Sequence, residues 1–358
     1  MHERRTMPDQ NRLSLIDITR GIGIAFVVFG HNWIVLHEKG ALFRLIFSFH
    51  MPLFFVLAGI FIRSSATIGR FALQRADSLL KPYFVVLGCI LLKQRLHPGA
   101  GDSMSLQDVM YGTGAVITWS PPMWFLPHLA IASLVSLLLI KAVGEQSRRY
   151  FSWVSAVLLA SGYAMLLCMT PDGVHVGPWR IPLNHGLPWS VDVLPITSAF
   201  IVFGYAWRDD IKDFGVQRTF LFPALLAFAA CQVIFHETID LSDRVYGQAL
   251  VATAQALLGI YICLCLAKLA SKHQILADAL SYLGARSLFV LIFHWYFQYL
   301  VFALASRHIS NPNFCGLLGF FAGIGIPLAI YEITRRIGIL RILLLPLSKA
   351  TRSPPDAA

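Results

Sequence analysis

Residues 19–31 read TRGIGIAFVVFGH, an apolar run that begins beside a cation and ends at an imidazole. Extended to 13–36, the segment is long enough to cross a bilayer as one helix. Similar apolar stretches recur along the chain: 56% of its residues are hydrophobic, 13% are charged, and the mean hydropathy is +0.64. Long uninterrupted runs favour a helical bundle over a barrel of short alternating strands. We therefore predict an all-α, polytopic integral membrane protein.

Ten transmembrane helices are predicted. Their approximate ranges are 13–36, 43–62, 79–95, 123–143, 151–169, 190–207, 218–236, 248–269, 286–305 and 314–338. An even number of spans places both termini on one side of the membrane. That side carries 21 of the 29 lysines and arginines, whereas the opposite side carries seven. Because cytoplasmic loops are enriched in Lys and Arg, this bias predicts that both termini are cytoplasmic.

The domain organisation expected from the sequence is simple. We predict one transmembrane domain over residues 1–345 and a short disordered cytoplasmic tail over 346–358. The basic N-terminus is interpreted as the start of an uncleaved first span, because the apolar run after it contains Arg20. The net charge of +10 is explained by orientation signals, so no nucleic-acid partner is expected. The six cysteines lack a C-x-x-C pair, and we expect packing roles and no metal site.

The first span carries a polar stripe. Arg20 and His31 are eleven residues apart, which offsets them by roughly 20° and separates them by roughly 16.5 Å along one helix face. Asp17 lies one turn before Arg20. A packing stripe, with Arg20 neutralised by Asp17, is the plain alternative. Ionisable groups inside membranes more often mark a pathway or site, and we favour that interpretation.

Other polar residues extend the candidate site. His50 in the second span is predicted at the same depth as His31, since the two helices form a hairpin centred near Gly40. The segment before the third span, GRFALQRADSLLKPYF, is basic. Its cations Arg70, Arg75 and Lys81 satisfy the charge bias and also offer a binding patch for an anionic cofactor.

Three further residues are weaker candidates for binding a polar substrate. Trp124 and His128 lie at the outer end of the fourth span, where a membrane-interface tryptophan is expected in any case. His294 lies in the middle of the ninth span, where an imidazole is costly unless it is hydrogen-bonded or functional.

These motifs resemble those of the membrane-bound acyltransferase 3 family of bacterial O-acyltransferases. DITRGIGIAFVVFGH is similar to that family's first-span signature, with Arg20 and His31 in its arginine and histidine positions. FHMPLFFVLAG, RADSLLKPYF, MWFLPHL, FIVFGYAWR and LGARSLFVLIFHW resemble later motifs, in order. The resemblance is greatest to the branch of exopolysaccharide and sugar O-acetyltransferases of the xanthan-modifying type. Two positions depart from the family pattern: Ala58 stands where a serine is common, and Ser78 where a basic residue is common.

The resemblance implies a function. It implies transfer of an acetyl or other acyl group from cytoplasmic acyl-CoA to a hydroxyl of a cell-surface or exported carbohydrate, at the bacterial inner membrane. Membrane lipids and the machinery of polysaccharide synthesis are the other partners expected. Arg20, Arg70, Arg75 and Lys81 would bind acyl-CoA. His31 would act as general base, with Arg20, Asp17 and His50 in the catalytic site. Trp124, His128 and His294 would bind the acceptor.

Alternatives remain at this stage. An acyl-histidine intermediate is one variant of the same reaction. A transporter or flippase of a lipid-linked saccharide would use the same polar stripe as its path, although the chain lacks an inverted repeat. A bis-histidine haem b protein would use His31 and His50 as axial ligands.

Overall fold

The helices of the computed structural model account for most of the described chain, which comprises residues 8–97, 104–170, 173–176, 179–181 and 186–347. In chain order they are α1 (Pro8–Gly30), α2 (Trp33–Glu38), α3 (Ala41–Phe47), α4 (His50–Ile60), α5 (Ile68–Arg75), the π-helix η1 (Ala76–Leu80), α6 (Lys81–Leu96), α7 (Leu106–Tyr111), the 3-10 helix η2 (Pro121–Trp124), α8 (Phe125–Val143), α9 (Arg148–Leu167), the 3-10 helix η3 (Pro188–Val193), α10 (Leu194–Ala206), α11 (Arg208–Lys212), α12 (Arg218–Ile234), α13 (Ala249–Ala270), α14 (Gln274–Ala285), α15 (Ser287–Ala305), α16 (Pro312–Thr334) and α17 (Gly338–Leu344).

Two small antiparallel sheets lie in the loops between helices. The first has strand order β1 (Met169–Thr170), β2 (Gly173–Val176) and β3 (Trp179–Ile181), with Val174 opposite Ile181. The second pairs β4 (Ile239–Asp240) with β5 (Val245–Tyr246). The predicted helical class is confirmed, with these strands as a minor addition.

Seven helical segments of the described chain are long and apolar enough to cross a membrane. They are Ala41–Ile60, Pro121–Val143, Arg148–Leu167, Pro188–Ala206, Ala249–Ala270, Ser287–Ala305 and Pro312–Thr334. Each agrees with a predicted span to within a few residues. The chain is therefore a polytopic helical membrane protein, and the count of ten spans remains a prediction.

The other three predicted spans lie in α1, α6 and α12. Helix α1 has 23 residues and contains Asp17 and Arg20, whereas α6 has 16 residues, with Lys81 at its start. Helix α12 has 17 residues and Pro223 in its interior. The sequence also predicted a single helix over residues 13–36. That boundary was wrong, because α1 ends at Gly30 and α2 begins at Trp33.

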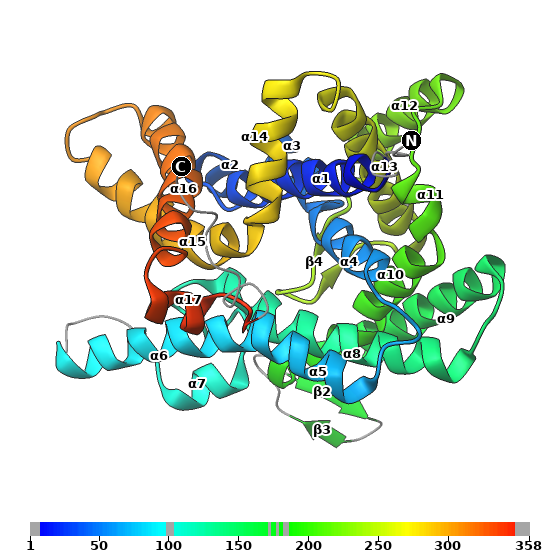
Figure 1. Cartoon of the computed structure of the whole chain (residues 1–358), viewed down its shortest axis with the longest axis horizontal. Helices are drawn as coiled ribbons and strands as arrows, with labels where there is room; N and C mark the ends of the chain where they lie inside the picture. Colours follow the sequence, from blue (N-terminus) through cyan, green and yellow to red (C-terminus); the bar gives the residue numbers. More distant parts are fainter. Residues whose placement is uncertain (1–7, 98–103, 171–172, 177–178, 182–185, 348–358) are drawn as a thin grey trace, which may run out of the picture.

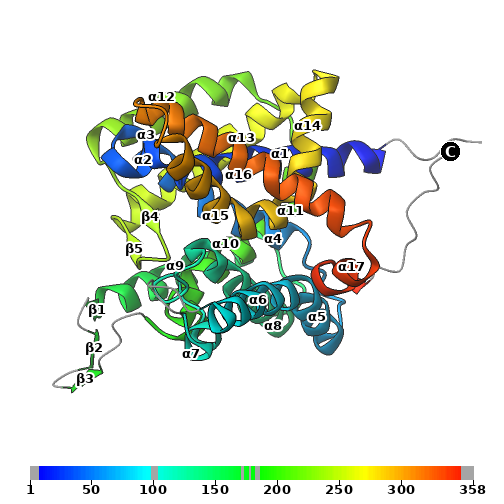
Figure 2. The same ribbon diagram turned by 90° about the vertical axis from the view of Figure 1, so that its left-hand side faces the viewer.

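The helices form two main groups around a central pair. Figure 2 shows α1, α13, α14 and α16 in the upper half of the molecule and α5, α6 and α8 in the lower half. Helices α4 and α10 lie between them, and the short α17 packs against α6. In Figure 1, α14 crosses α1 near the centre of the molecule.

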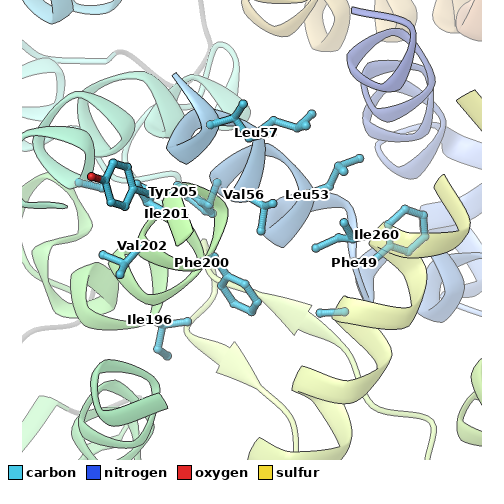
Figure 3. Packing of buried hydrophobic residues seen from close by; sticks show 14 of the residues in the cluster. Phe49, Leu53, Val56, Leu57, Ile196, Phe200, Ile201, Val202, Tyr205 and Ile260 are labelled. Carbon is cyan, nitrogen blue, oxygen red and sulfur yellow. The ribbon is translucent and has the colours of Figure 1, made fainter. Parts of the chain in front are cut away.

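The central pair is held by close apolar packing. Val56 and Leu57 of α4 belong to the same buried cluster as Ile201 and Val202 of α10 (Figure 3). The two helices approach at glycines. A methyl group on Gly204 would overlap the backbone carbonyl oxygen of Val56, so only glycine permits this crossing.

Helices α1 and α14 cross in the same way. A methyl group on Gly21 would overlap the carbonyl oxygen of Leu280, and one on Gly284 would overlap that of Asp17. This crossing fixes the position of the middle of α1 in the described bundle. It thereby positions Arg20, which lies between Asp17 and Gly21 in the chain.

Candidate active site

A cavity of about 390 Å³ lies where the two groups of helices face each other. Its wall is built by α1, α4, the end of α5, η1, η2, α8, the end of α14, the start of α15, α16 and α17. Segments more than 300 residues apart in the sequence thus enclose one space. The wall contains both apolar side chains and a few charged ones.

One face of α1 supplies the polar stripe of this wall. Arg20, Ile24, Val27 and His31 all line the cavity, as expected for residues spaced three or four apart on a helix. The predicted shared face of Arg20 and His31 is therefore confirmed. Asp17 lies outside this lining, and its Oδ1 accepts a hydrogen bond of 3.3 Å from Arg20 Nη1.

Three arginines converge on the cavity from different parts of the chain. They are Arg20 of α1, Arg75 of α5 and Arg286 at the start of α15. No carboxylate belongs to the described lining of this cavity. A surface with several guanidinium groups and no lining acid favours an anionic ligand, above all one with phosphate or carboxylate oxygens.

Arg20 and Arg75 are held by aromatic rings. The guanidinium carbon of Arg20 lies 4.6 Å from the ring centre of Phe61, and that of Arg75 lies 4.8 Å from the ring centre of Phe71. Burial and the nearby charge of Arg20 lower the pKa of Arg75 to about 10. Arg75 therefore remains a cation at neutral pH, and the two like charges favour a bound anion between them.

Arg75 stands directly before an irregular helical turn. The π-helix η1 separates α5 from α6, and its residues Ser78 and Leu79 line the cavity. A π-turn widens the helix locally, and such turns often occur at functional sites. Here the turn brings η1 against the cavity beside Arg75.

Arg286 was not among the predicted site residues. Its guanidinium carbon lies 3.5 Å from the ring centre of Tyr282 and 5.1 Å from that of Tyr331. Its Nε is 3.9 Å from Glu332 Oε1. The sequence signal was the motif LGARSLFVLIFHW, in which this arginine precedes the ninth span on the same side as Arg75.

Two further hollows continue from the arginine end of the cavity. One of about 380 Å³ shares Phe61, Arg75 and Ser78 with it. The next, of about 330 Å³, shares Arg63 with the second and is also lined by Arg70. The predicted cofactor residues Arg70 and Arg75 thus lie along one series of adjoining spaces, and Arg70 is at its exposed end.

His31 lines the cavity at the break between α1 and α2. Its backbone N–H donates to Val27 O, and Asn32 begins α2 by accepting a hydrogen bond from Ile34 N–H. The His31 ring contacts Phe47 and Trp295, with ring centres 5.9 and 5.5 Å away. The break therefore holds the imidazole against aromatic rings, at the edge of the cavity.

His50 lies near His31 but outside the cavity lining. Its Nδ1 donates to Ile46 O at 2.8 Å, and its ring centre is 4.7 Å from that of Phe47. Phe47 contacts both imidazoles. The two histidines, which were predicted at the same depth, thus contact one shared aromatic ring.

The three predicted acceptor residues are divided between the cavity and its surroundings. Trp124 lines the cavity. His128 packs behind it, with Nδ1 bonded to Trp189 O and Nε2 to Thr197 Oγ1. His294 is fully buried beside His31, with ring centres 5.6 Å apart. Of these three side chains, only Trp124 reaches the described cavity wall.

The comparison with protein families agrees with this arrangement. The sequence pattern of the acyltransferase 3 family, which describes an acyltransferase domain, matches residues 13–332. The chain belongs to the acyltransferase 3 family. No curated protein and no solved structure matched the chain in the other two comparisons. The protein is thus a membrane acyltransferase, and the matched segment contains Arg20, His31, Arg75 and Arg286.

The acyltransferase uses Lys81, predicted to bind the cofactor, in a contact with the end of its own chain. Lys81 Nζ donates to Asp77 Oδ1 and to Leu345 O, both at 2.6 Å. Asp77 Oδ2 accepts from the backbone N–H of Leu347 at 2.7 Å. These bonds hold residues 345–347 against η1 and α6.

This contact involves the first residues of the segment 346–358, which was predicted to be a disordered tail. Residues 348–358 lie outside the described part of the chain. Leu344, Leu345 and Pro346, by contrast, line the cavity of the acyltransferase. Lys81, which was predicted to bind the cofactor, therefore supports the cavity wall indirectly. It holds in place the segment 344–346 that lines the cavity.

Proposed function

We propose that this acyltransferase moves an acetyl or related acyl group from cytoplasmic acyl-CoA to a hydroxyl of an exported or cell-surface carbohydrate. Its site would lie within a bacterial inner membrane. The acceptor would be an exopolysaccharide or a lipid-linked saccharide, supplied by proteins of polysaccharide synthesis. Membership in the family supports acyl transfer, and the arginine-lined cavity supports an acyl-CoA donor. The carbohydrate acceptor and the bacterial inner membrane are what the resemblance of the sequence motifs implies.

One observation carries the proposal: a single described cavity is lined by three arginines and by His31. Coenzyme A carries several phosphates and a long, thin pantetheine arm that ends in the thioester. The arginines offer donors for the phosphates, and the apolar wall between Arg20 and His31 suits the arm. The adjoining hollows near Arg63 and Arg70 offer room for the nucleotide end.

The separation along α1 fits this assignment. Eleven residues of helix separate Arg20 from His31, which corresponds to roughly 16.5 Å. The charge bias of the loops predicts that the Arg20 end faces the cytoplasm, where acyl-CoA is made. His31 would then meet the thioester deeper in the membrane, near an acceptor that enters from the other side.

The chemical step follows from the imidazole. The unprotonated nitrogen of His31 takes the proton from the acceptor hydroxyl as its oxygen attacks the thioester carbonyl. A tetrahedral intermediate forms and collapses, and the carbon–sulfur bond breaks. The leaving thiolate takes the proton from the His31 imidazolium. The products are an ester and free coenzyme A, with His31 returned to its first state.

Surface-glycan mass spectrometry tests the proposal. Cells that lack the gene are complemented with the wild-type chain, with His31→Ala or with His308→Ala. His308 is an exposed histidine in the loop before α16, so its replacement is the matched control. We expect the acyl mass difference on surface glycans with the wild-type and His308→Ala chains, and its loss with His31→Ala.

A second assay separates the proposal from transport. Membranes carrying each chain are solubilised in detergent and given radiolabelled acetyl-CoA together with the extracted glycans. An acyltransferase should form the labelled ester in detergent. A flippase would not, because it needs a sealed membrane and only moves its substrate. Transfer that is undiminished in His31→Ala, at equal protein levels, would refute the role of His31 as base.

A further inference from the structure

His294 presents a hydrogen-bonding problem that the proposed function leaves open. Its side chain is fully buried on α15. Its Nδ1 is 2.9 Å from both Val290 O and Leu291 O, in the preceding turn. Its Nε2 is also buried and has no hydrogen-bond partner among the described residues. A buried polar atom left unpaired is costly, so it calls for an explanation.

The two carbonyls determine the tautomer of this ring. A carbonyl oxygen can only accept a hydrogen bond, so Nδ1 of His294 carries the proton and donates. In the neutral imidazole, Nε2 then has a lone pair and no proton. The unpaired atom is therefore an acceptor, and it needs a donor.

His31 is the neighbouring group that can supply one. The ring centres of His31 and His294 are 5.6 Å apart and the rings are tilted by 40°. At this separation the facing edges of two imidazoles approach hydrogen-bond range, and such bonds often tighten only when substrates bind. The described ring atoms of His31 make no hydrogen bond with other described residues.

Helix α15 also holds the backbone of His31. Gln298, one turn after His294, donates from Nε2 to His31 O at 2.9 Å. Gln298 is buried, and its Oε1 accepts from Asn32 Nδ2 at 3.4 Å. Trp295 contacts the His31 ring edge. Helix α15 thus fixes the backbone of His31. The orientation of the His31 ring about its side-chain bonds still needs a hydrogen-bond partner.

We propose that His294 is a positioning residue whose Nε2 accepts a hydrogen bond from the imidazole N–H of His31. The proposal rests on the proposed role of His31 as base. The bond places the N–H of His31 toward α15 and its unprotonated nitrogen toward the cavity. His294 therefore selects the tautomer of His31 that can take a proton, and it does not itself touch the acceptor sugar.

The tautomers provide a test that is independent of activity. The protein is labelled with ¹⁵N-histidine, placed in lipid bilayers and measured by solid-state NMR. The His294 signals are identified by their absence in His294→Asn. We expect a protonated Nδ1 and an unprotonated Nε2 on His294, and a shift of that Nε2 signal in His31→Ala. A protonated Nε2, or no shift in His31→Ala, would overturn the proposal.

Two substitutions of His294 distinguish the role of its Nδ1 from the role of its Nε2. The amide of Asn occupies the place of Nδ1 and keeps a donor for Val290 O, but it loses the acceptor at Nε2. The longer Gln reaches the place of Nε2 and restores an acceptor oxygen there. We expect His294→Asn to lower kcat by about 100-fold, and His294→Gln to remain within about tenfold of the wild type. KM for acetyl-CoA should change little in both.

The outcomes are distinguishable. Equal kcat values for the Asn and Gln variants, with matching Tm values, would overturn the acceptor role of Nε2. A rise in KM with unchanged kcat would instead assign His294 to substrate binding and overturn the proposal. If the wild-type chain transferred no acyl group, the proposed function would fail, whereas the NMR measurement would still decide the hydrogen bond.

Discussion

Arg20 illustrates how the chain accommodates an arginine within an apolar helix. A guanidinium group in hydrocarbon is expensive, and here the cost is offset by three features. Asp17 pairs with it at 3.3 Å, the Phe61 ring lies beneath it, and the side chain keeps 28% of its surface exposed toward the cavity. The residue is held in place without being neutralised on every side, as a ligand-binding cation requires.

We predict that Arg20→Lys raises KM for acetyl-CoA by about 10- to 100-fold, because lysine keeps the charge but loses the planar fork and the ring stacking. Steady-state kinetics of the purified protein measure this. Arg148→Lys is the matched control, since Arg148 is half exposed and pairs with Asp210 away from the cavity. An unchanged KM in Arg20→Lys would contradict the role of Arg20 in donor binding.

Asp240, the last residue of strand β4, gives a prediction about pH. Burial, reinforced by the charge of Asp243, raises the pKa of Asp240 from 3.8 to about 6. The folded state therefore binds this proton more tightly than the unfolded state does, and the carboxylate destabilises the fold above pH 6. The penalty falls as the pH drops from 6 and is absent below about pH 3.8.

We expect Asp240→Asn to be more stable than the wild type at pH 7, because its amide carries no charge to desolvate. The difference in Tm should narrow progressively between pH 6 and pH 4. Thermal unfolding in detergent across this pH range measures it. A constant difference at every pH would show that the titration of Asp240 does not contribute.

At the scale of the elements, the break after α1 is the main departure from the predicted helices. Hydropathy continues through residues 31–36, so the sequence favoured one helix. Asn32 ends it, because its side chain caps α2 through Ile34 N–H and donates to Gly316 O on α16. A cap and a contact 284 residues away in the chain override the local propensity.

Helix crossings give the next prediction. Gly204→Ala should destabilise the fold by about 1–3 kcal/mol or more, since its methyl group would meet the backbone of Val56, which cannot rotate away. Gly325→Ala is the control, because a methyl group at that position of α16 meets open space and improves helix propensity. Unfolding in detergent compares the two. Equal stabilities would show that the α4–α10 crossing tolerates separation.

At the scale of the whole molecule, the sequence predicted what depends on local periodicity. The helical class, seven spans and the shared face of Arg20 and His31 follow from hydropathy and the helical repeat. The cavity brings Arg286 together with Arg20 and Arg75, which are more than 200 residues away in the chain, and the bond from Lys81 to Leu345 joins residues 264 apart. A single sequence has no signal for such pairings, so the bond between Lys81 and Leu345 was not predicted.

The topology yields a final prediction. Ser271, after α13, lies on the predicted cytoplasmic side, and Ser310, before α16, lies on the opposite side. In intact spheroplasts, a membrane-impermeant maleimide should label Ser310→Cys above the wild-type level and should label Ser271→Cys only after permeabilisation. The reverse pattern would place the termini outside and would remove the cytoplasmic route for acyl-CoA.

The hydrogen bonds from Lys81 and Asp77 to residues 345 and 347, just after α17, show that the cavity depends on residues beyond the family match. The family match stops at residue 332, yet Leu344, Leu345 and Pro346 complete the wall beside the arginines. A chain shortened to the matched segment would keep every proposed catalytic side chain but would lose the part of the cavity wall that Leu344, Leu345 and Pro346 form. Tags and fusions therefore belong beyond residue 347, and the minimal catalytic unit is longer than the recognisable family segment.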